Sequence, residues 1–163
     1  MRLIERESQL AALHQYADEA GRGQGRLVLI SGEAGVGKSV LLEEFAQDLD
    51  EVRWLWAGCD GMFTPAALGP LLDIAGQLNG ELLQLCRAEA KRDQIYGALL
   101  RQLGDLESLT VLVIEDVHWA DEATLDLLSY LGRRIQHMRV LLLVTYRDDA
   151  LEADDPLRLT LGT

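Results

Sequence analysis

Residues 32–39 read Gly32-Glu33-Ala34-Gly35-Val36-Gly37-Lys38-Ser39, and the type of fold follows from this glycine-rich stretch and its neighbours. Residues 26–31 form a short apolar run before it, Arg-Leu-Val-Leu-Ile-Ser, which predicts a strand buried on both faces of a parallel sheet. After it, Leu41, Phe45 and Leu49 recur every four positions, so we expect an amphipathic helix over residues 38–49. The stretch therefore joins a buried strand to a helix.

This stretch fits the phosphate-loop pattern G-x-x-x-x-G-K-[ST], also called Walker A, at every fixed position. Glycines allow backbone N–H groups to surround phosphate oxygens, and the following helix adds its positive end. Lys38 supplies a full positive charge, and Ser39 offers a hydroxyl to Mg²⁺. Residues 32–39 and Val40 are thus the predicted nucleotide-binding residues. The alternative interpretation is a glycine-rich surface turn beside an incidental lysine.

Strands and helices alternate along the rest of the chain. Hydrophobic patterning predicts further strands over residues 54–57, 110–114 and 139–145. It predicts helices over residues 7–21 and 121–135, and two or three more between residues 66 and 104. This alternation indicates an α/β fold of the P-loop NTPase type, with a parallel sheet of at least four strands and helices on both faces.

An acidic pair, Glu115-Asp116, directly follows the predicted strand over 110–114. Phosphate chemistry needs a carboxylate near Mg²⁺, and P-loop proteins place it at the end of another apolar strand, called Walker B. By position, Glu115 is the metal-side residue and Asp116 the residue that orients or deprotonates water. A common arrangement has Asp first and Glu second, so which acid activates water stays open, and we expect slow hydrolysis. The alternative is a solvated turn or helix entry.

Three more polar residues are candidate sensors of the nucleotide. Thr145 and Arg147 follow the last predicted strand, which a parallel sheet would bring to the same edge as the phosphate loop. Arg147 would contact the γ-phosphate, unless it pairs with the acids that follow it. His118 is a candidate sensor or a packing residue under a helix start, and Trp54 and Trp56 are expected to pack in the core.

Composition excludes several classes of function. The 163 residues carry 15 basic and 27 acidic side chains, for a net charge of -12, so we expect no direct binding of DNA by this domain. The N-terminus lacks the pattern of a signal peptide, and no apolar run approaches the roughly 20 residues of a membrane span. We therefore expect a cytoplasmic protein without membrane contact, with Cys59 and Cys86 as reduced thiols.

The chain resembles the N-terminal ATPase domain of large LuxR-type transcriptional regulators, within the STAND branch of AAA-like P-loop ATPases. Beyond the phosphate loop, the resemblance rests on short motifs spread over nearly the whole chain: residues 6–10, 58–60, 68–71, 114–121 and 145–148. The block Val-His-Trp-Ala-Asp at 117–121 is the most specific of them, because many unrelated ATPases and kinases share the phosphate loop.

This resemblance implies a switch in which ATP holds an active, often oligomeric form and ADP an inactive one. It implies that Arg6 lies near the adenine, that Lys38 and Ser39 serve phosphate and Mg²⁺, and that Arg147 is a sensor. The family's usual glycine before Arg6 is Glu5 here, which bears on the adenine contact. Attached C-terminal parts would sense a ligand and bind DNA.

The resemblance also bears on domain organisation. Residues 1–163 form one expected ATPase domain, with a helix and turn over 1–25 and a nucleotide-binding core over 26–163, as a fragment of a longer regulator. The family's sheet implies a fifth strand beyond residue 163, beside the strand over 27–31. Without it, that strand has an unpaired edge, so we expect the chain to dimerise, swap, or cover the edge with one of its terminal segments.

Three functions compete at this point. The first is a regulatory ATPase that binds ATP and Mg²⁺ and hydrolyses ATP slowly. The second is a nucleotide-dependent interaction module without significant turnover. The third, a small P-loop kinase, is disfavoured because no Arg-rich lid or acceptor-binding carboxylate follows the phosphate loop.

Overall fold

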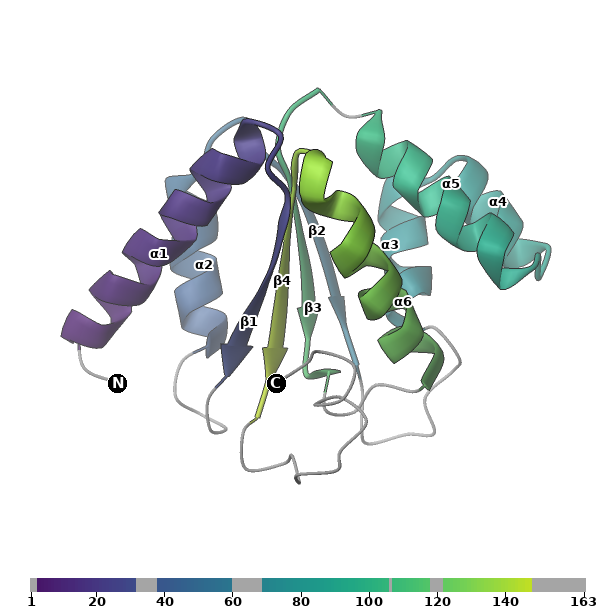
Figure 1. Ribbon diagram of the computed structural model, residues 1–163. Coiled ribbons are helices and arrows are strands. Elements are labelled where there is room, and N and C mark those ends of the chain that lie inside the picture. Colours follow the sequence, from purple (N-terminus) through teal and green to yellow (C-terminus); the bar gives the residue numbers. More distant parts are fainter. Residues whose placement is uncertain (1–2, 32–37, 60–68, 106, 118–121, 148–163) are drawn as a thin grey trace.

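The computed structural model describes residues 3–31, 38–59, 69–105, 107–117 and 122–147 (Figure 1). For residues 3–6, 38 and 39 it describes the backbone alone. The strands are β1 (Arg26–Ser31), β2 (Arg53–Gly58), β3 (Thr110–Glu115) and β4 (Val140–Tyr146). The helices are α1 (Leu3–Gly21), α2 (Lys38–Asp48), α3 (Gly69–Leu78), α4 (Glu81–Arg87), α5 (Arg92–Gly104) and α6 (Glu122–Arg134), with a 3₁₀ turn, η2 (Ile135–His137).

The four described strands form one sheet in the order β1-β4-β3-β2, and all neighbouring pairs are parallel. Residues 111–114 of β3 and 140–145 of β4 are fully buried, whereas β1 and β2 lie at the two edges. The continuous apolar sequences of β3 and β4 follow from their central position, because a central strand of a covered parallel sheet has both faces in the core. The predicted α/β fold with a parallel sheet is confirmed.

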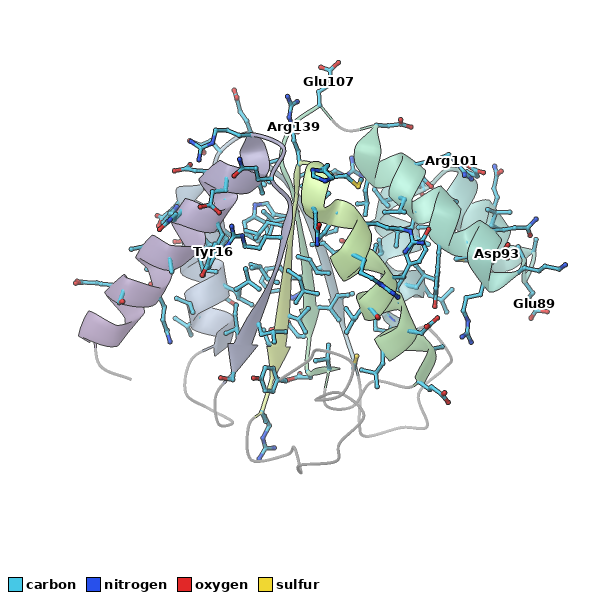
Figure 2. All side chains as sticks on the ribbon, viewed as in Figure 1. Tyr16, Glu89, Asp93, Arg101, Glu107 and Arg139 are labelled. Atoms are coloured by element: carbon cyan, nitrogen blue, oxygen red, sulfur yellow. The ribbon has the colours of Figure 1, made fainter. Side chains whose placement is uncertain are left out.

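Helices cover both faces of the sheet, with α1 and α2 on one side and α3 to α6 on the other (Figure 1). Alternate residues of β3 divide between the two cores: Val111 and Val113 pack with α1 and α2, and Leu112 and Ile114 with α3 to α6. Side chains fill the space between helices and sheet, while charged residues such as Arg101 lie on the outside (Figure 2).

The structure confirms most of the expected elements and moves some of their ends. Helix α1 begins at Leu3 rather than near residue 7, because its apolar face, which marks it in the sequence, starts only at Leu10. Between residues 69 and 104 there are three helices. Helix α6 ends at Arg134 and continues as a 3₁₀ turn; Asp121, the first residue of the predicted helix, lies outside the described residues.

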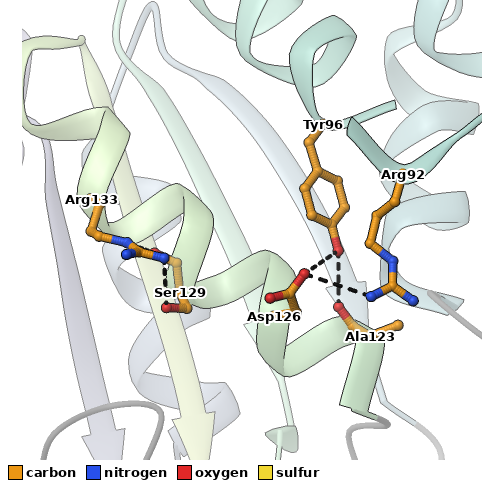
Figure 3. A network of polar contacts seen from close by, with 6 residues as sticks. All are labelled: Arg92, Tyr96, Ala123, Asp126, Ser129 and Arg133. Carbon is orange, nitrogen blue, oxygen red and sulfur yellow. Dashed lines mark hydrogen bonds and ion pairs between the residues drawn. The ribbon is translucent and has the colours of Figure 1, made fainter. Parts of the chain in front are cut away.

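A buried tyrosine attaches α6 to α5. The hydroxyl of Tyr96 has one proton, which is shared between the carbonyl oxygen of Ala123 at 3.2 Å and Oδ2 of Asp126 at 3.4 Å, and Arg92 lies 3.7 Å from the same carboxylate oxygen (Figure 3). The ring of Tyr96 also packs against that of Tyr130, at an angle of 47°. These contacts hold the first turn of α6, which follows the acidic end of β3 in the chain.

The two edges of the sheet differ. On β2, the side-chain amide of Gln77 accepts from the backbone N–H of Trp56 at 2.9 Å and donates to the carbonyl of Trp56 at 2.7 Å. This amide from α3 makes the bonds that a neighbouring strand would make. On β1, Leu27, Val28 and Leu29 remain partly exposed. Among the described residues, therefore, only β2 has its outer edge paired in this way.

Cys59 and Cys86 are not in a disulfide bond. Burial raises the pKa of the Cys86 thiol above its usual value, so the neutral form is favoured near neutral pH. Within the described part of the chain, no helix is long and apolar enough to cross a membrane.

Candidate functional site

The carboxyl ends of the strands bring the predicted site residues to one edge of the sheet. Ser31 at the end of β1 pairs in register with Tyr146, and Gly58 pairs with Glu115. Helix α2 starts at the same edge with Lys38 (Figure 1). Crevices outside the carboxyl ends of parallel strands are the usual ligand sites of such sheets.

Some predicted residues are not described in full. The predicted phosphate-loop residues 32–37 and His118 lie outside the described residues. For Arg6, Lys38 and Ser39 the structure gives the backbone: Arg6 lies in the first turns of α1, and Lys38 and Ser39 open α2. Val40 follows them and is 43% exposed.

Glu115 lies on the face of the sheet that α2 covers. Side chains alternate along a strand, and Val111 and Val113 pack in the same core as Leu41 and Phe45 of α2. Glu115 continues that alternation at the end of β3, half-buried. Its side chain therefore lies on the same side of the sheet as α2, the helix that begins with Lys38. This is the arrangement that the predicted Mg²⁺ role of Glu115 requires.

The indole of Trp56 holds the carboxylate of Glu115. Nε1 of Trp56 donates to Oε2 of Glu115 at 2.6 Å, a short hydrogen bond between a neutral donor and an acid side chain. Hydrogen bonds to ionised carboxylates are shorter and stronger than neutral ones. Trp56 thus belongs to the site as well as to the core.

Asp116 adopts a left-handed backbone conformation, with φ of 60°. Its N–H donates to Oγ1 of Thr145 at 3.0 Å, and Thr145 is 1% exposed. The side chain of Asp116 is exposed. Asp tolerates this region better than most residues, and residues held there cluster at functional sites. The hydroxyl of Thr145, a predicted sensor, therefore contacts the backbone of the second acid.

Arg147 comes directly after β4 and is half-buried. It makes an interaction of its own within the protein. The structure thus places Glu115, Asp116, Thr145 and Arg147 at the ends of two adjacent central strands, as the sequence predicts.

The donor set at this edge suits Mg²⁺ bound together with a nucleotide. Mg²⁺ prefers oxygen ligands and is usually held by one or two carboxylates plus substrate phosphates and water. Glu115 supplies one carboxylate on the α2 face. No group of three His, Cys, Asp or Glu side chains that could hold a metal ion occurs in the described part of the chain. The described residues at this edge therefore fit an Mg²⁺ ion that binds together with the phosphates of a nucleotide.

A cavity of about 260 Å³ lies between α1 and β1, with Leu41 of α2 also in its lining. Gln9, Leu13 and Tyr16 line it from α1, and Val28 to Ser31 line it from β1. Ser31, one of the lining residues, immediately precedes the predicted phosphate loop in the sequence.

Trp56 is the site residue that sequence analysis missed. Its place in an apolar strand indicates core packing, and the structure does place it against the α2 core. The contact with Glu115 depends on the pairing register of β2 with β3, in which Trp56 is opposite Val113 and thus diagonal to Glu115. A tryptophan near the end of a strand that neighbours the acidic strand is the one signal that could have suggested it.

Comparison with known proteins gives a relative and several structural neighbours. A protein of Rhizobium meliloti (strain 1021) that carries no assigned function is 30% identical in an alignment 207 positions long, which covers 98% of this chain and 20% of that protein. The chain thus spans about a fifth of the length of this curated relative.

Solved structures share the fold. Cdc6p of Pyrobaculum aerophilum has a TM-score of 0.68 and 22% identity, over 99% of this chain and 44% of that one. The ORC1 protein of Aeropyrum pernix, solved in complex with DNA, has a TM-score of 0.60 and 18% identity, over 90% and 41%. RuvB of Thermotoga maritima has a TM-score of 0.53 and 20% identity, over 98% and 43%.

At these identities the structural likeness shows a common fold. The sequence family adds more, because residues 2–144 match the family described as AAA ATPase domain. That range contains the phosphate-loop pattern, the acidic pair and nearly all of β4. The chain belongs to the AAA ATPase domain family.

Proposed function

We propose that this domain binds ATP with Mg²⁺ and hydrolyses it slowly, as the nucleotide switch of a larger protein. The observation that carries the proposal is the position of Glu115. It ends the central strand β3 on the sheet face covered by α2, the helix that opens with Lys38 and Ser39 of the phosphate-loop pattern. Phosphate and metal chemistry need these groups at one edge.

The proposed roles follow from residue chemistry. Backbone N–H groups of residues 32–40 surround the phosphates, and Lys38 balances their charge. Ser39 and Glu115 hold Mg²⁺, partly through water, and the ion neutralises charge on the phosphate oxygens. Asp116, exposed beside Glu115, orients the attacking water and takes its proton. Arg147 and Thr145 respond to the γ-phosphate, with His118 as a third candidate, and Arg6 lies near the adenine.

For the whole protein we propose a LuxR-type, STAND-class transcriptional regulator. The motifs that resemble this group and the fivefold greater length of the curated relative support a longer chain with further domains. The net charge of -12 argues that any DNA contact belongs to another part of such a protein. One domain over residues 1–163, with residues 1–25 preceding the core, stays a prediction.

Thermal unfolding with added nucleotide tests the binding part. Ligand at about 100 times its dissociation constant stabilises the folded state by roughly 2.7 kcal/mol, which for a domain of this size raises Tm by several degrees. We expect this shift with ATP and Mg²⁺ and its loss in Lys38→Ala. The matched control is Lys91→Ala, which removes the other lysine, an exposed residue at the start of α5. Equal behaviour of all three proteins would rule out nucleotide binding at this loop.

Phosphate release tests the hydrolysis part. Asp116→Asn removes the charge but keeps a residue that tolerates the left-handed backbone, so the fold of the strand end is retained. We expect nucleotide binding to persist and turnover to fall by about 10²–10⁴-fold, the usual contribution of a general base. Binding without turnover in the unaltered chain would favour the interaction module. Transfer of phosphate to an acceptor other than water would favour the kinase.

A further inference from the structure

Trp56 makes a contact that core packing does not require. Its Nε1 lies 2.6 Å from Oε2 of Glu115. An indole N–H can only donate a hydrogen bond, so the indole is the donor in this pair and the carboxylate oxygen is the acceptor. The bond restricts the rotation of the Glu115 carboxyl group, since one of its oxygens is tied to a ring that cannot turn freely.

The ring of Trp56 is itself held from several directions. The backbone N–H and carbonyl of Trp56 are both bonded to the amide of Gln77. The ring centroid lies 6.1 Å from that of Trp54, whose ring packs edge-on against Phe45 of α2 at 5.7 Å. A row of aromatic rings therefore runs from α2 along β2 and ends at the Glu115 carboxylate.

We propose that Trp56 is a positioning residue for Glu115, fixing its carboxylate for the Mg²⁺ that accompanies the nucleotide. This inference rests on the proposed nucleotide site. A ligand carboxylate that is hydrogen-bonded by a packed side chain loses little freedom when the metal binds, and such supporting partners commonly matter almost as much as the ligands. The strand neighbouring the acidic strand thus contributes to metal affinity without touching the metal.

The test is the Mg²⁺ dependence of nucleotide binding. Trp56→Phe keeps an aromatic ring and removes the N–H. The matched control is Trp54→Phe, which alters the same strand and the same ring row but has its ring against Phe45. ATP affinity is measured by calorimetry in EDTA and across a Mg²⁺ titration. We expect Trp56→Phe to need about tenfold more Mg²⁺, with unchanged affinity in EDTA, and Trp54→Phe to match the unaltered protein.

A double-mutant cycle shows whether Trp56 acts through Glu115. Glu115→Gln weakens the metal ligand, and adding Trp56→Phe should then change the Mg²⁺ requirement no further. Additive losses, or an unaltered Mg²⁺ requirement in Trp56→Phe, would overturn the proposal. So would a Trp56→Phe protein without a cooperative unfolding transition, because the residue would then be a structural support. Absence of ATP binding in the unaltered protein would instead refute the proposed function.

Discussion

At the scale of single residues, Asp116 adopts a backbone conformation that is uncommon for residues other than glycine. Its φ of 60° places it in the left-handed region, and its N–H points to the buried hydroxyl of Thr145 on the adjacent strand β4. Residues in this region cost about 1–3 kcal/mol and persist where neighbours enforce them. The hydroxyl of Thr145 is thus one support for the orientation of the second acid.

Thr145→Val tests this support. Valine keeps the shape and the branching of threonine, so the strand is retained, but the N–H of Asp116 loses its acceptor. We expect the free energy of unfolding to fall by about 1–2 kcal/mol in urea denaturation, with slower ATP hydrolysis. Thr145→Ser keeps the hydroxyl and serves as the control. A Thr145→Val protein as stable as the unaltered protein would show that the bond does not hold Asp116.

At the scale of elements, α3 closes the outer edge of β2. Gln77 bonds both backbone polar groups of Trp56, and its amide also donates to the carbonyl oxygen of Asp73, one turn earlier in α3. Exposed sheet edges invite pairing with other chains, and native proteins commonly cover them. One amide side chain does so here, and it also fixes the strand that carries the ring next to Glu115.

Gln77→Leu removes the amide and leaves the packing volume similar. Because Gln77 is exposed and water can replace part of its bonding, we expect a loss of about 1 kcal/mol in the free energy of unfolding. Hydrogen exchange of the Trp56 amide should become faster. Gln84→Leu, at an exposed position of α4, is the matched control. Unchanged exchange at Trp56 would contradict the role of Gln77.

At the scale of the whole molecule, β1 lies at the opposite edge of the sheet, and none of the other described strands pairs with its outer side. The sheet order places β1 at this edge, its apolar side chains are partly exposed, and a cavity lies beside it. A parallel sheet normally has its strands covered, so the outer backbone groups of β1 call for a partner. Self-association is one way to supply it, and a segment of the same chain is another.

Light scattering combined with hydrogen exchange tests this expectation. We expect either a dimer at micromolar concentration or a monomer whose outer β1 amides are protected. Exchange at those amides of β1 that do not bond to β4 is the informative readout, with the central strand β3 as the protected reference. A monomer whose outer β1 amides exchange as fast as those of an unfolded chain would show the prediction to be wrong.

The sequence by itself determined the parallel α/β fold, the phosphate-loop pattern and the acidic pair at the end of a strand. These features depend on spacing within one segment: apolar runs define strands, and a fixed pattern joins residues 32–39 to the following helix. Local periodicity could not place the start of α1, whose first turns carry few apolar residues.

Only the tertiary structure decided which residues support the acids. The strand order β1-β4-β3-β2 puts β2 on one side of the acidic strand and β4 on the other. Trp56 therefore reaches Glu115, and Thr145 reaches Asp116, across sequence separations of 59 and 29 residues. Such contacts depend on register between strands that are distant in sequence, and register is set by packing of the whole sheet against both helix layers.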